Sequence, residues 1–258
     1  MGTDELQYER RDAVAFIRFN RPAARNAMTW AMYEALFECC EKAEQDDDVR
    51  VVVLRGAGGK AFIAGTDIKQ FTEFKTGEDG VVYEKRVERV VGRLEAVSKP
   101  TVAVVDGFAI GGGLAIAAVC DLRICSPNAK FGLPIARTLG NCLSMENYTR
   151  LVSLIGSART KEIVFTARVL SADEALTTGL ATEVVSADHL DDRVGELCKL
   201  LARHAPLTLR VTKEAVRRIT AAEVPNGQDL VIDVYSSEDF HEGVAAFVDN
   251  REPRWRAR

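Results

Sequence analysis

Apolar residues near the start of the chain follow first a strand period and then a helix period. Residues 5–9 and 13–19 alternate or run apolar, with polar Arg10–Asp12 between them, which predicts a β-hairpin. Residues 30–45 repeat their apolar side chains at helical spacing, and Thr29 just before them is a plausible N-cap residue. We therefore expect two strands and then a helix.

Buried strands alternate with helices through the next eighty or so residues. Val49–Leu54 and Thr101–Val105 are rich in β-branched residues, which favours buried strands. Lys99-Pro100 ends the helix that precedes the second of these strands, because the residue before a proline avoids the helical region. Three further elements are predicted: a helix over 79–97, a helix from within Gly111–Gly113 to Cys120, and a short strand over Asp121–Cys125.

From residue 145 onward the pattern is nearly all helical. The predicted helical segments are 157–166, 171–178, 188–203, 207–221 and 228–248. Alternating strands and helices in the first half predict an α/β core, and the later segments predict a helical extension that starts near residue 190.

Length, charge and hydropathy narrow the class of protein. The 258 residues suit one large domain, or a core with a small extension. Apolar stretches such as Val102–Val105 and Leu114–Cys120 are far shorter than the roughly 20 residues that span a bilayer. Net charge is −4, and no basic stripe is interleaved with aromatic residues. Neither a membrane nor nucleic acid is therefore an expected partner.

The cysteines and histidines do not predict a metal site. The six cysteines include no CxxC pair, and no cluster of cysteine and histidine has the spacing of zinc ligands. The polar opening MGTDELQYERRD is unlike a secretory signal. Reduced thiols and a cytoplasmic location are the expectation.

Two glycine-rich turns, at 61–69 and 106–114, each follow a buried strand and are the candidates for chemistry. Glycine lets backbone approach a ligand closely, and the start of a helix presents free N–H groups. Two such turns can place two N–H groups on one oxyanion. Composition alone favours the plainer interpretation, in which each is only a tight turn between a strand and a helix.

Nucleotide-binding motifs do not fit these turns. Gly56-Ala57-Gly58-Gly59-Lys60 resembles part of a P-loop, but Leu54 stands where that motif needs glycine and Ala61 where it needs serine or threonine. The dinucleotide pattern G-x-G-x-x-G is absent from Gly107–Gly113, which also lies in mid-chain. A nucleotide-hydrolysing P-loop protein is therefore not expected.

Further motifs accompany the two turns. Asn20-Arg21-Pro22 with Arg25-Asn26-Ala27 precedes them, and other motifs follow in order: Lys99-Pro100 through Gly113, Cys120-Asp121, Phe131-Gly132-Leu133-Pro134, and Ser171-Ala172-Asp173-Glu174-Ala175 through Gly179-Leu180-Ala181. The combination resembles the crotonase (enoyl-CoA hydratase/isomerase) superfamily over most of residues 12–190. The resemblance implies a spiral of repeated β-β-α units over 1–190 and a helical trimerisation region over 191–258, assembled as a homotrimer or homohexamer.

The same resemblance implies a site for an acyl-CoA thioester, with coenzyme A entering as part of the substrate and no separate cofactor. The backbone N–H groups of Thr66 and Gly112 would hold the thioester oxygen as an enolate forms. Coenzyme A contacts would come from the backbone of Ala24, Ala64 and Ile68 and from the side chains of Arg25 and Lys69. The alternative for both cations is solvation at the surface.

The chain departs from the family pattern at two positions. A standard hydratase has one glutamate where this chain has Ala115 and a second where it has Ile135. Hydration needs groups that activate water and deliver a proton, and neither of these side chains transfers protons. Conventional hydration by two glutamates is therefore not expected.

Glu146 is the candidate replacement. Dienoyl-CoA isomerases and a dehalogenase branch of the superfamily place a catalytic carboxylate in the stretch that aligns near Ser144, two residues before Glu146. Glu146 is the only carboxylate between Pro134 and Arg150. The alternative is a charge in the first turn of a helix, stabilised by the helix dipole and without a chemical role. Arg137, Cys142, Ser144 and Tyr148 are further polar candidates.

The sequence thus predicts an acyl-CoA enzyme that stabilises a thioester enolate. The reaction expected is isomerisation of an enoyl-CoA, with Glu146 as the acid and base, or hydration through a rearranged site. A crotonase-fold protein that binds acyl-CoA without turnover is the alternative.

Overall fold

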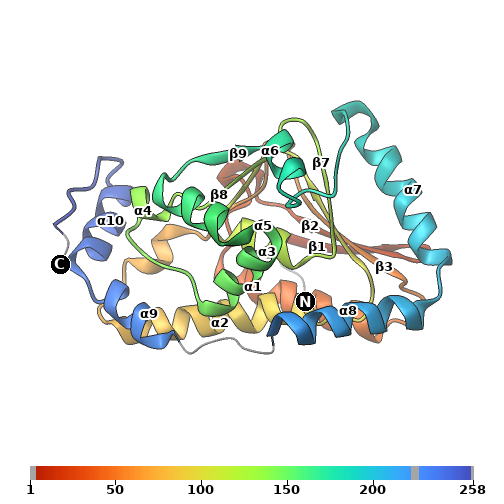
Figure 1. Cartoon of the computed structure of the whole chain (residues 1–258), viewed down its shortest axis with the longest axis horizontal. Coiled ribbons are helices and arrows are strands. Elements are labelled where there is room, and N and C mark those ends of the chain that lie inside the picture. The colour runs from red at the N-terminus through yellow and green to blue at the C-terminus, as the bar shows by residue number, and fades with distance from the viewer. Residues whose placement is uncertain (1–3, 222–226, 257–258) are drawn as a thin grey trace.

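Two sheets form the core of the computed structural model, which describes residues 4–221 and 227–256 (Figure 1). The larger sheet has the strand order β1 (Leu6–Arg11), β2 (Val14–Phe19), β3 (Val51–Gly56), β5 (Thr101–Val105), β7 (Leu122–Cys125) and β10 (Glu183–Val184). The smaller sheet has the order β4 (Ala61–Ala64), β6 (Phe108–Ile110), β8 (Lys130–Gly132) and β9 (Val169–Ser171). Pairing is parallel except between β1 and β2 and between β8 and β9.

The chain passes repeatedly from the larger sheet to the smaller one and then into a helix. β3 leads to β4 and α2, β5 to β6 and α3, and β7 to β8 and α4. The helices are α1 (Trp30–Gln45), α2 (Gly77–Glu95), α3 (Gly112–Val119), α4 (Ile135–Thr138), α5 (Met145–Phe165), α6 (Ala172–Thr177), α7 (Leu190–Arg203), α8 (Pro206–Ala221), α9 (Gln228–Tyr235) and α10 (Glu238–Val248). This is the predicted α/β spiral of β-β-α units with a C-terminal helical region.

The central strands of the larger sheet are buried on both faces, which explains their unbroken apolar runs. One face joins the main core with α1, α2 and α3, and includes Val52, Leu54 and Ala103. The other face packs against α7, which stands on its own side of the sheet in Figure 1, and includes Val51, Val53 and Val102. No helix in the described part of the chain is both long and apolar enough to cross a membrane.

Most of the elements predicted from the periodicity are present. The hairpin is confirmed, and Thr29 caps α1 by accepting a hydrogen bond from the Met32 N–H at 3.2 Å. The strand expected over Val49–Leu54 begins instead at Val51 and extends to Gly56. The buried strand over Thr101–Val105 has the predicted bounds.

The second half of the described chain is mostly helical, as predicted, but it includes two short strands, and two of the predicted helices have different bounds. β9 and β10 are strands, because they pair with β8 and β7, and these partners are distant in the sequence. The helix expected over 157–166 begins at Met145 and is interrupted at Gly156, where φ is 76°. The segment 228–248 is two helices, since Ser237 caps a new one by accepting from the Phe240 N–H. Residues 1–3, 222–226 and 257–258, which belong to the predicted core and helical region, lie outside the described residues.

Glycines let α9 lie directly against α2. A Cβ at Gly77 would come within 2.4 Å of the Ile232 carbonyl oxygen, and one at Gly80 within 2.3 Å of the Tyr235 ring. The two glycines are three residues apart and therefore share a face of α2. This close packing brings Tyr235 beside α2. Together, α9 and α10 lie at the end of the molecule farthest from α7 (Figure 1).

Candidate active site

All the residues predicted to form the site except Glu146 line one cavity of about 500 Å³. They come from three segments: the loop before α1, the turn after β4 and the start of α3. The residues brought together are Ala24, Arg25, Ala64, Thr66, Ile68, Lys69 and Gly112.

The two glycine-rich turns lie side by side at this cavity. A Cβ at Gly112 would be 4.0 Å from the Thr66 amide nitrogen, and one at Gly111 would be 3.7 Å from the Gly65 Cα. The parallel bridge between Met28 and Thr66 uses the Gly65 carbonyl and the Asp67 N–H, and thus leaves the Thr66 N–H out. Gly112 is the first residue of α3, where N–H groups have no partner within the helix. Within residues 4–221 and 227–256, neither N–H has a hydrogen-bond acceptor.

The side chain of Thr66 belongs to a cluster of buried hydroxyls. Its Oγ1 lies 2.9 Å from the Tyr33 Oη and 3.1 Å from the Tyr83 Oη. Burial raises the pKa of Tyr33 to about 12 and that of Tyr83 well above its usual value. Both phenols therefore stay neutral near pH 7 and add no negative charge beside the two N–H groups.

Cations surround the mouth of the cavity. Arg21 forms an ion pair with Asp67 at 2.8 Å. Arg25 and Lys69 are exposed, and neither has an acidic partner among the residues that the structure describes. The guanidinium of Arg25 lies 5.7 Å from the ring centroid of Phe108. Arg25 and Lys69 are thus the cations that remain available for an anionic ligand.

The loop that carries Arg25 is held by the buried side chain of Asn26. Its side chain donates to the carbonyls of Ala57 and Ala61 at 3.0 and 2.8 Å, and accepts from the Arg21 N–H. Arg25 and Asn26 both have left-handed backbone conformations, with φ of 50° and 58°. Asparagine tolerates that conformation better than most residues, which suits it to this turn.

One buried carboxyl, Glu84 of α2, also lines the cavity. It is 7% exposed. Its Oε1 accepts a hydrogen bond from the Tyr235 Oη at 2.9 Å, and its Oε2 accepts from the Ser144 N–H at 3.2 Å. Burial, with smaller contributions from Glu146 and Glu88, raises the pKa of Glu84 to about 7 against the effect of these two hydrogen bonds.

Comparison with known proteins agrees with this geometry. Residues 9–258 match the family described as enoyl-CoA hydratase/isomerase. The chain belongs to that family.

Its relatives include several enoyl-CoA hydratases. A short-chain-enoyl-CoA hydratase of Clostridium acetobutylicum is 34% identical, with 98% of this chain and 97% of the relative covered. A 2,3-dehydroadipyl-CoA hydratase of Escherichia coli is 31% identical over 98% of this chain and 99% of the relative. A solved methylmalonyl-CoA decarboxylase in complex with 2-nitronate-propionyl-CoA superposes with a TM-score of 0.91 at 26% identity, covering 98% of this chain and 99% of its own. The predicted crotonase fold is confirmed.

The two positions where the sequence resemblance implies the glutamates of a hydratase are occupied by apolar side chains of the cavity wall. Ala115 and Ile135 both line the cavity. Among the described lining residues only Asp67 and Glu84 have carboxyl groups, and Asp67 is paired with Arg21. Glu84 is therefore the one carboxyl among the described lining residues of this cavity that forms no ion pair.

Glu146 faces a different space. It lies in the first turn of α5, as predicted, after the N-cap residue Ser144. It lines a smaller cavity of about 180 Å³ that it shares with Lys85, Glu88 and Glu84. Glu84 thus stands between the two cavities. A catalytic role for Glu146 stays a prediction.

The sequence carried one signal for Glu84 that the motifs did not use. Within the predicted helix over 79–97, Glu84 occupies the same face as Gly80 and Val87, which are both buried. An acidic residue on the apolar face of an amphipathic helix is rarely buried without a partner or a function. Its partner Tyr235 is 151 residues away in the sequence, and no local pattern indicates that contact.

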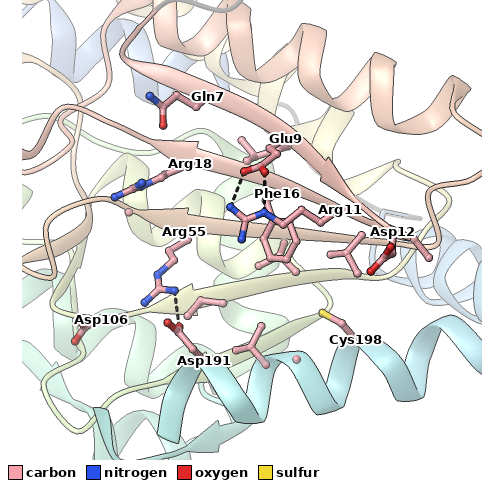
Figure 2. Close-up of a pocket in the computed structure, with 18 of the residues that line it drawn as sticks. Gln7, Glu9, Arg11, Asp12, Phe16, Arg18, Arg55, Asp106, Asp191 and Cys198 are labelled. Atoms are coloured by element: carbon pink, nitrogen blue, oxygen red, sulfur yellow. Dashed lines mark hydrogen bonds and ion pairs between the residues drawn. The ribbon is translucent and has the colours of Figure 1, made fainter. Parts of the chain in front are cut away.

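A larger cavity of about 750 Å³ lies between β1–β3 and α7 and contains none of the predicted site residues (Figure 2). Four of its charged side chains form ion pairs with one another: Glu9 pairs with Arg11 at 2.7 Å, and Arg55 pairs with Asp191 at 2.5 Å. In the described residues, no group of three or more His, Cys, Asp or Glu side chains is arranged to hold a metal ion. The cavity of Thr66 and Gly112 therefore remains the candidate active site.

Proposed function

We propose that this protein acts on an acyl-CoA thioester and stabilises its enolate with the backbone N–H groups of Thr66 and Gly112. The observation that carries the proposal is that these two N–H groups lie side by side at one cavity and have no acceptor among the described residues. Losing one such donor typically costs about 2.7–4 kcal/mol of activation free energy. The names of the relatives support the substrate class, because those of the two hydratases and of the decarboxylase all refer to coenzyme A thioesters.

Coenzyme A binding is assigned to the residues at the mouth of the cavity. We propose backbone contacts from Ala24, Ala64 and Ile68 and phosphate contacts from Arg25 and Lys69, which have no acidic partner in the described part of the chain. No separate cofactor is proposed. The Ala64 N–H already donates to the Arg25 carbonyl at 3.1 Å, so the contact from Ala64 would use its carbonyl group.

The reaction that we favour is isomerisation of an enoyl-CoA, with non-standard hydration as the second form of the same enolate chemistry. Apolar side chains at Ala115 and Ile135 argue against hydration by the two usual glutamates. A family member that binds acyl-CoA without turnover is the alternative. The buried carboxyl in the cavity wall favours the enzyme over that alternative.

Exposed apolar side chains on α8 support a proposal that copies of the chain associate. Four of its apolar side chains are more than half exposed in the single chain: Leu207, Val211, Val216 and Ile219. We propose that residues 191–258 join copies of the chain into a homotrimer or homohexamer, and that the protein works in the cytoplasm.

Product analysis by liquid chromatography that separates the isomers, coupled to mass spectrometry, tests the proposal with hex-3-enoyl-CoA and hex-2-enoyl-CoA side by side. Conversion of the first into the second without a mass change supports isomerisation, and addition of water to the second supports hydration. Methylmalonyl-CoA belongs in the same assay because of the decarboxylase among the structural neighbours. Binding of all three without conversion would contradict the enzyme and favour the binding protein.

A further inference from the structure

We propose that Glu84 is the group that removes the α-proton of the thioester and returns a proton to the product. This inference rests on the proposed function, because the α-proton leaves readily only if the thioester oxygen is stabilised as an enolate. The placement of Glu84 carries it: the carboxyl lines the same cavity as Thr66 and Gly112. The residue before it on α2, Tyr83, contacts the Thr66 side chain at 3.1 Å.

A directed chain of hydrogen bonds holds this carboxyl. Asn141 Nδ2 donates to the Tyr235 Oη at 3.3 Å, and Tyr235 in turn donates its only hydroxyl proton to Glu84 Oε1 at 2.9 Å. The Ser144 N–H fixes the other oxygen. Each carboxylate oxygen accepts one bond here and has capacity for another. The arrangement therefore orients Glu84 and leaves it able to accept a proton.

Aromatic rings surround the part of α2 that carries Glu84. Phe71, Phe74, Tyr83, Tyr235 and Phe240 form a connected aromatic cluster around this part of α2, with ring centroids 4.7 to 6.3 Å apart. Burial in that cluster is the main reason that the pKa of Glu84 is raised to about 7. A base whose pKa lies near the working pH can both accept and return a proton.

Titratable groups reach Glu84 from several elements. Those that act on it or on which it acts are Tyr33 of α1, Tyr83 and Glu88 of α2, Cys142 before α5, Glu146 and Tyr148 of α5, and Tyr235 of α9. Lys85 lines the cavity of Glu146 together with Glu84. The cavity of Thr66 and Gly112 also has Arg21, Arg25, Asp67 and Lys69 in its wall. Arg150 neutralises Glu88 through bonds of 2.5 and 2.6 Å. Glu146 is thus the neighbouring charge with most influence on when Glu84 ionises.

The other carboxyls are less suited. Asp67 is held by the ion pair with Arg21 and accepts from the Lys69 N–H at 3.2 Å. Glu146 lines the smaller cavity and not the one that contains the two free N–H groups. Glu84 alone, among the carboxyls of the described residues, borders both spaces.

The proton transfers balance without another reactant. The C–H bond at the α-carbon breaks, its proton forms an O–H bond on Glu84, and the electron pair moves to the thioester oxygen. For a 3-enoyl thioester, Glu84 then delivers a proton to the γ-carbon and the double bond moves to the 2-position. For a saturated thioester, the proton returns to the α-carbon, which in D₂O appears as exchange. Nothing is oxidised or reduced.

Exchange of the α-protons of butanoyl-CoA in D₂O, followed by mass spectrometry, tests the assignment. We expect Glu84→Gln to slow the exchange by about 10²-fold or more. Its dissociation constant for butanoyl-CoA, measured by calorimetry, is expected to stay within about threefold, since no coenzyme A contact changes. Glu78→Gln, an exposed position on the same helix, is the matched control and should exchange at the wild-type rate.

The outcomes separate this inference from the function on which it rests. Exchange by the wild type that persists in Glu84→Gln overturns the assignment of Glu84 alone. Exchange lost in Glu146→Gln but kept in Glu84→Gln overturns it in favour of the residue expected from the sequence. Binding by the wild type without exchange overturns both the enolate mechanism and the role of Glu84.

A pH profile provides a second test that does not require Glu84→Gln to fold. The exchange rate of the wild type should fall as pH decreases through about 7, the raised pKa of Glu84. Tyr235→Phe removes a hydrogen bond that lowers this pKa, so the fall should move to higher pH. A purely structural glutamate would leave the profile of both proteins flat over this range, and that result would overturn the proposal.

Discussion

The hydroxyls of Tyr33 and Thr66 leave no room for a side chain at Gly112. The φ of Gly112 is one that other residues also adopt. A Cβ there, however, would lie 2.7 Å from the Tyr33 Oη and 3.3 Å from the Thr66 Oγ1. Both hydroxyls are held in the buried cluster with Tyr83 and have little room to retreat. The lack of a side chain at this residue therefore sets the separation of the two N–H groups.

Gly112→Ala is expected to lower kcat/KM by about 10²–10³-fold, the usual effect of losing one donor to an oxyanion. The added methyl group must push the start of α3 away from Thr66. Steady-state kinetics on the substrate identified by product analysis measures the change. Tyr33→Phe combined with Gly112→Ala removes the nearest atom and should recover part of the loss. No recovery would show that the hydroxyl is not what limits the space.

Glu84 should also leave a signature in stability. Its pKa is raised from 4.5 to about 7 by folding, so the native state binds more protons than the unfolded state between these values. Stability is then highest below pH 4.5 for this group and declines as pH rises to about 7, by about 3 kcal/mol in total. Urea denaturation at pH 5 and pH 8 should show a smaller decline for Glu84→Gln than for the wild type. Equal declines in the two proteins would mean that the pKa of Glu84 is the same in the folded and unfolded states.

At the scale of elements, the contact between α2 and α9 is what joins Tyr235 to Glu84. The contact exists because Gly77 and Gly80 present bare backbone to α9. One turn further along α2, Glu84 meets the Tyr235 hydroxyl. The geometry of the carboxyl is thus set by helix packing as much as by its own hydrogen bonds.

Gly80→Ala should test that packing. A Cβ there would overlap the Tyr235 ring at 2.3 to 2.6 Å, and overpacking of this kind typically costs about 1–3 kcal/mol. Gly195→Ala is the matched control, because it lies in α7 with nothing within 4 Å of its Cβ and should stabilise by up to about 1 kcal/mol. Denaturation midpoints measure both. Gly80→Ala should also slow α-proton exchange, and unchanged exchange would separate the helix contact from the chemistry.

The sequence predicted the elements that are defined locally and missed those defined by distant partners. The cap at Thr29 and the buried strand at Thr101–Val105 follow from neighbouring residues, and both are present. β9 and β10 are short, and their pairing with β8 and β7 alone makes them strands. Thr66 and Gly112 could be predicted because each lies in a glycine-rich turn whose local sequence determines its backbone conformation. Glu84 has no motif, and only the fold sets it in the wall.

For the whole molecule, the exposed apolar face of α8 predicts that the single chain is not the working unit. We expect a mass of three or six times 28.3 kDa in sedimentation equilibrium. Val211→Asp with Ile219→Asp should lower that mass, because a buried unpaired charge opposes association. Thr208→Asp places the same charge at a polar position of α8 and is the control. A wild-type monomer would contradict the assembly.

The position of Glu84 between two cavities has a consequence for hydrogen isotopes. A substrate in the cavity of Thr66 and Gly112 covers one side of the carboxyl. The cavity of Glu146, with the exposed side chain of Lys85 in its wall, lies on the other side. A proton taken from the substrate can therefore exchange with water from behind before it is returned. The hydrogen delivered to the product then comes largely from the solvent, and each turnover erases the isotopic origin of the hydrogen that the substrate carried in.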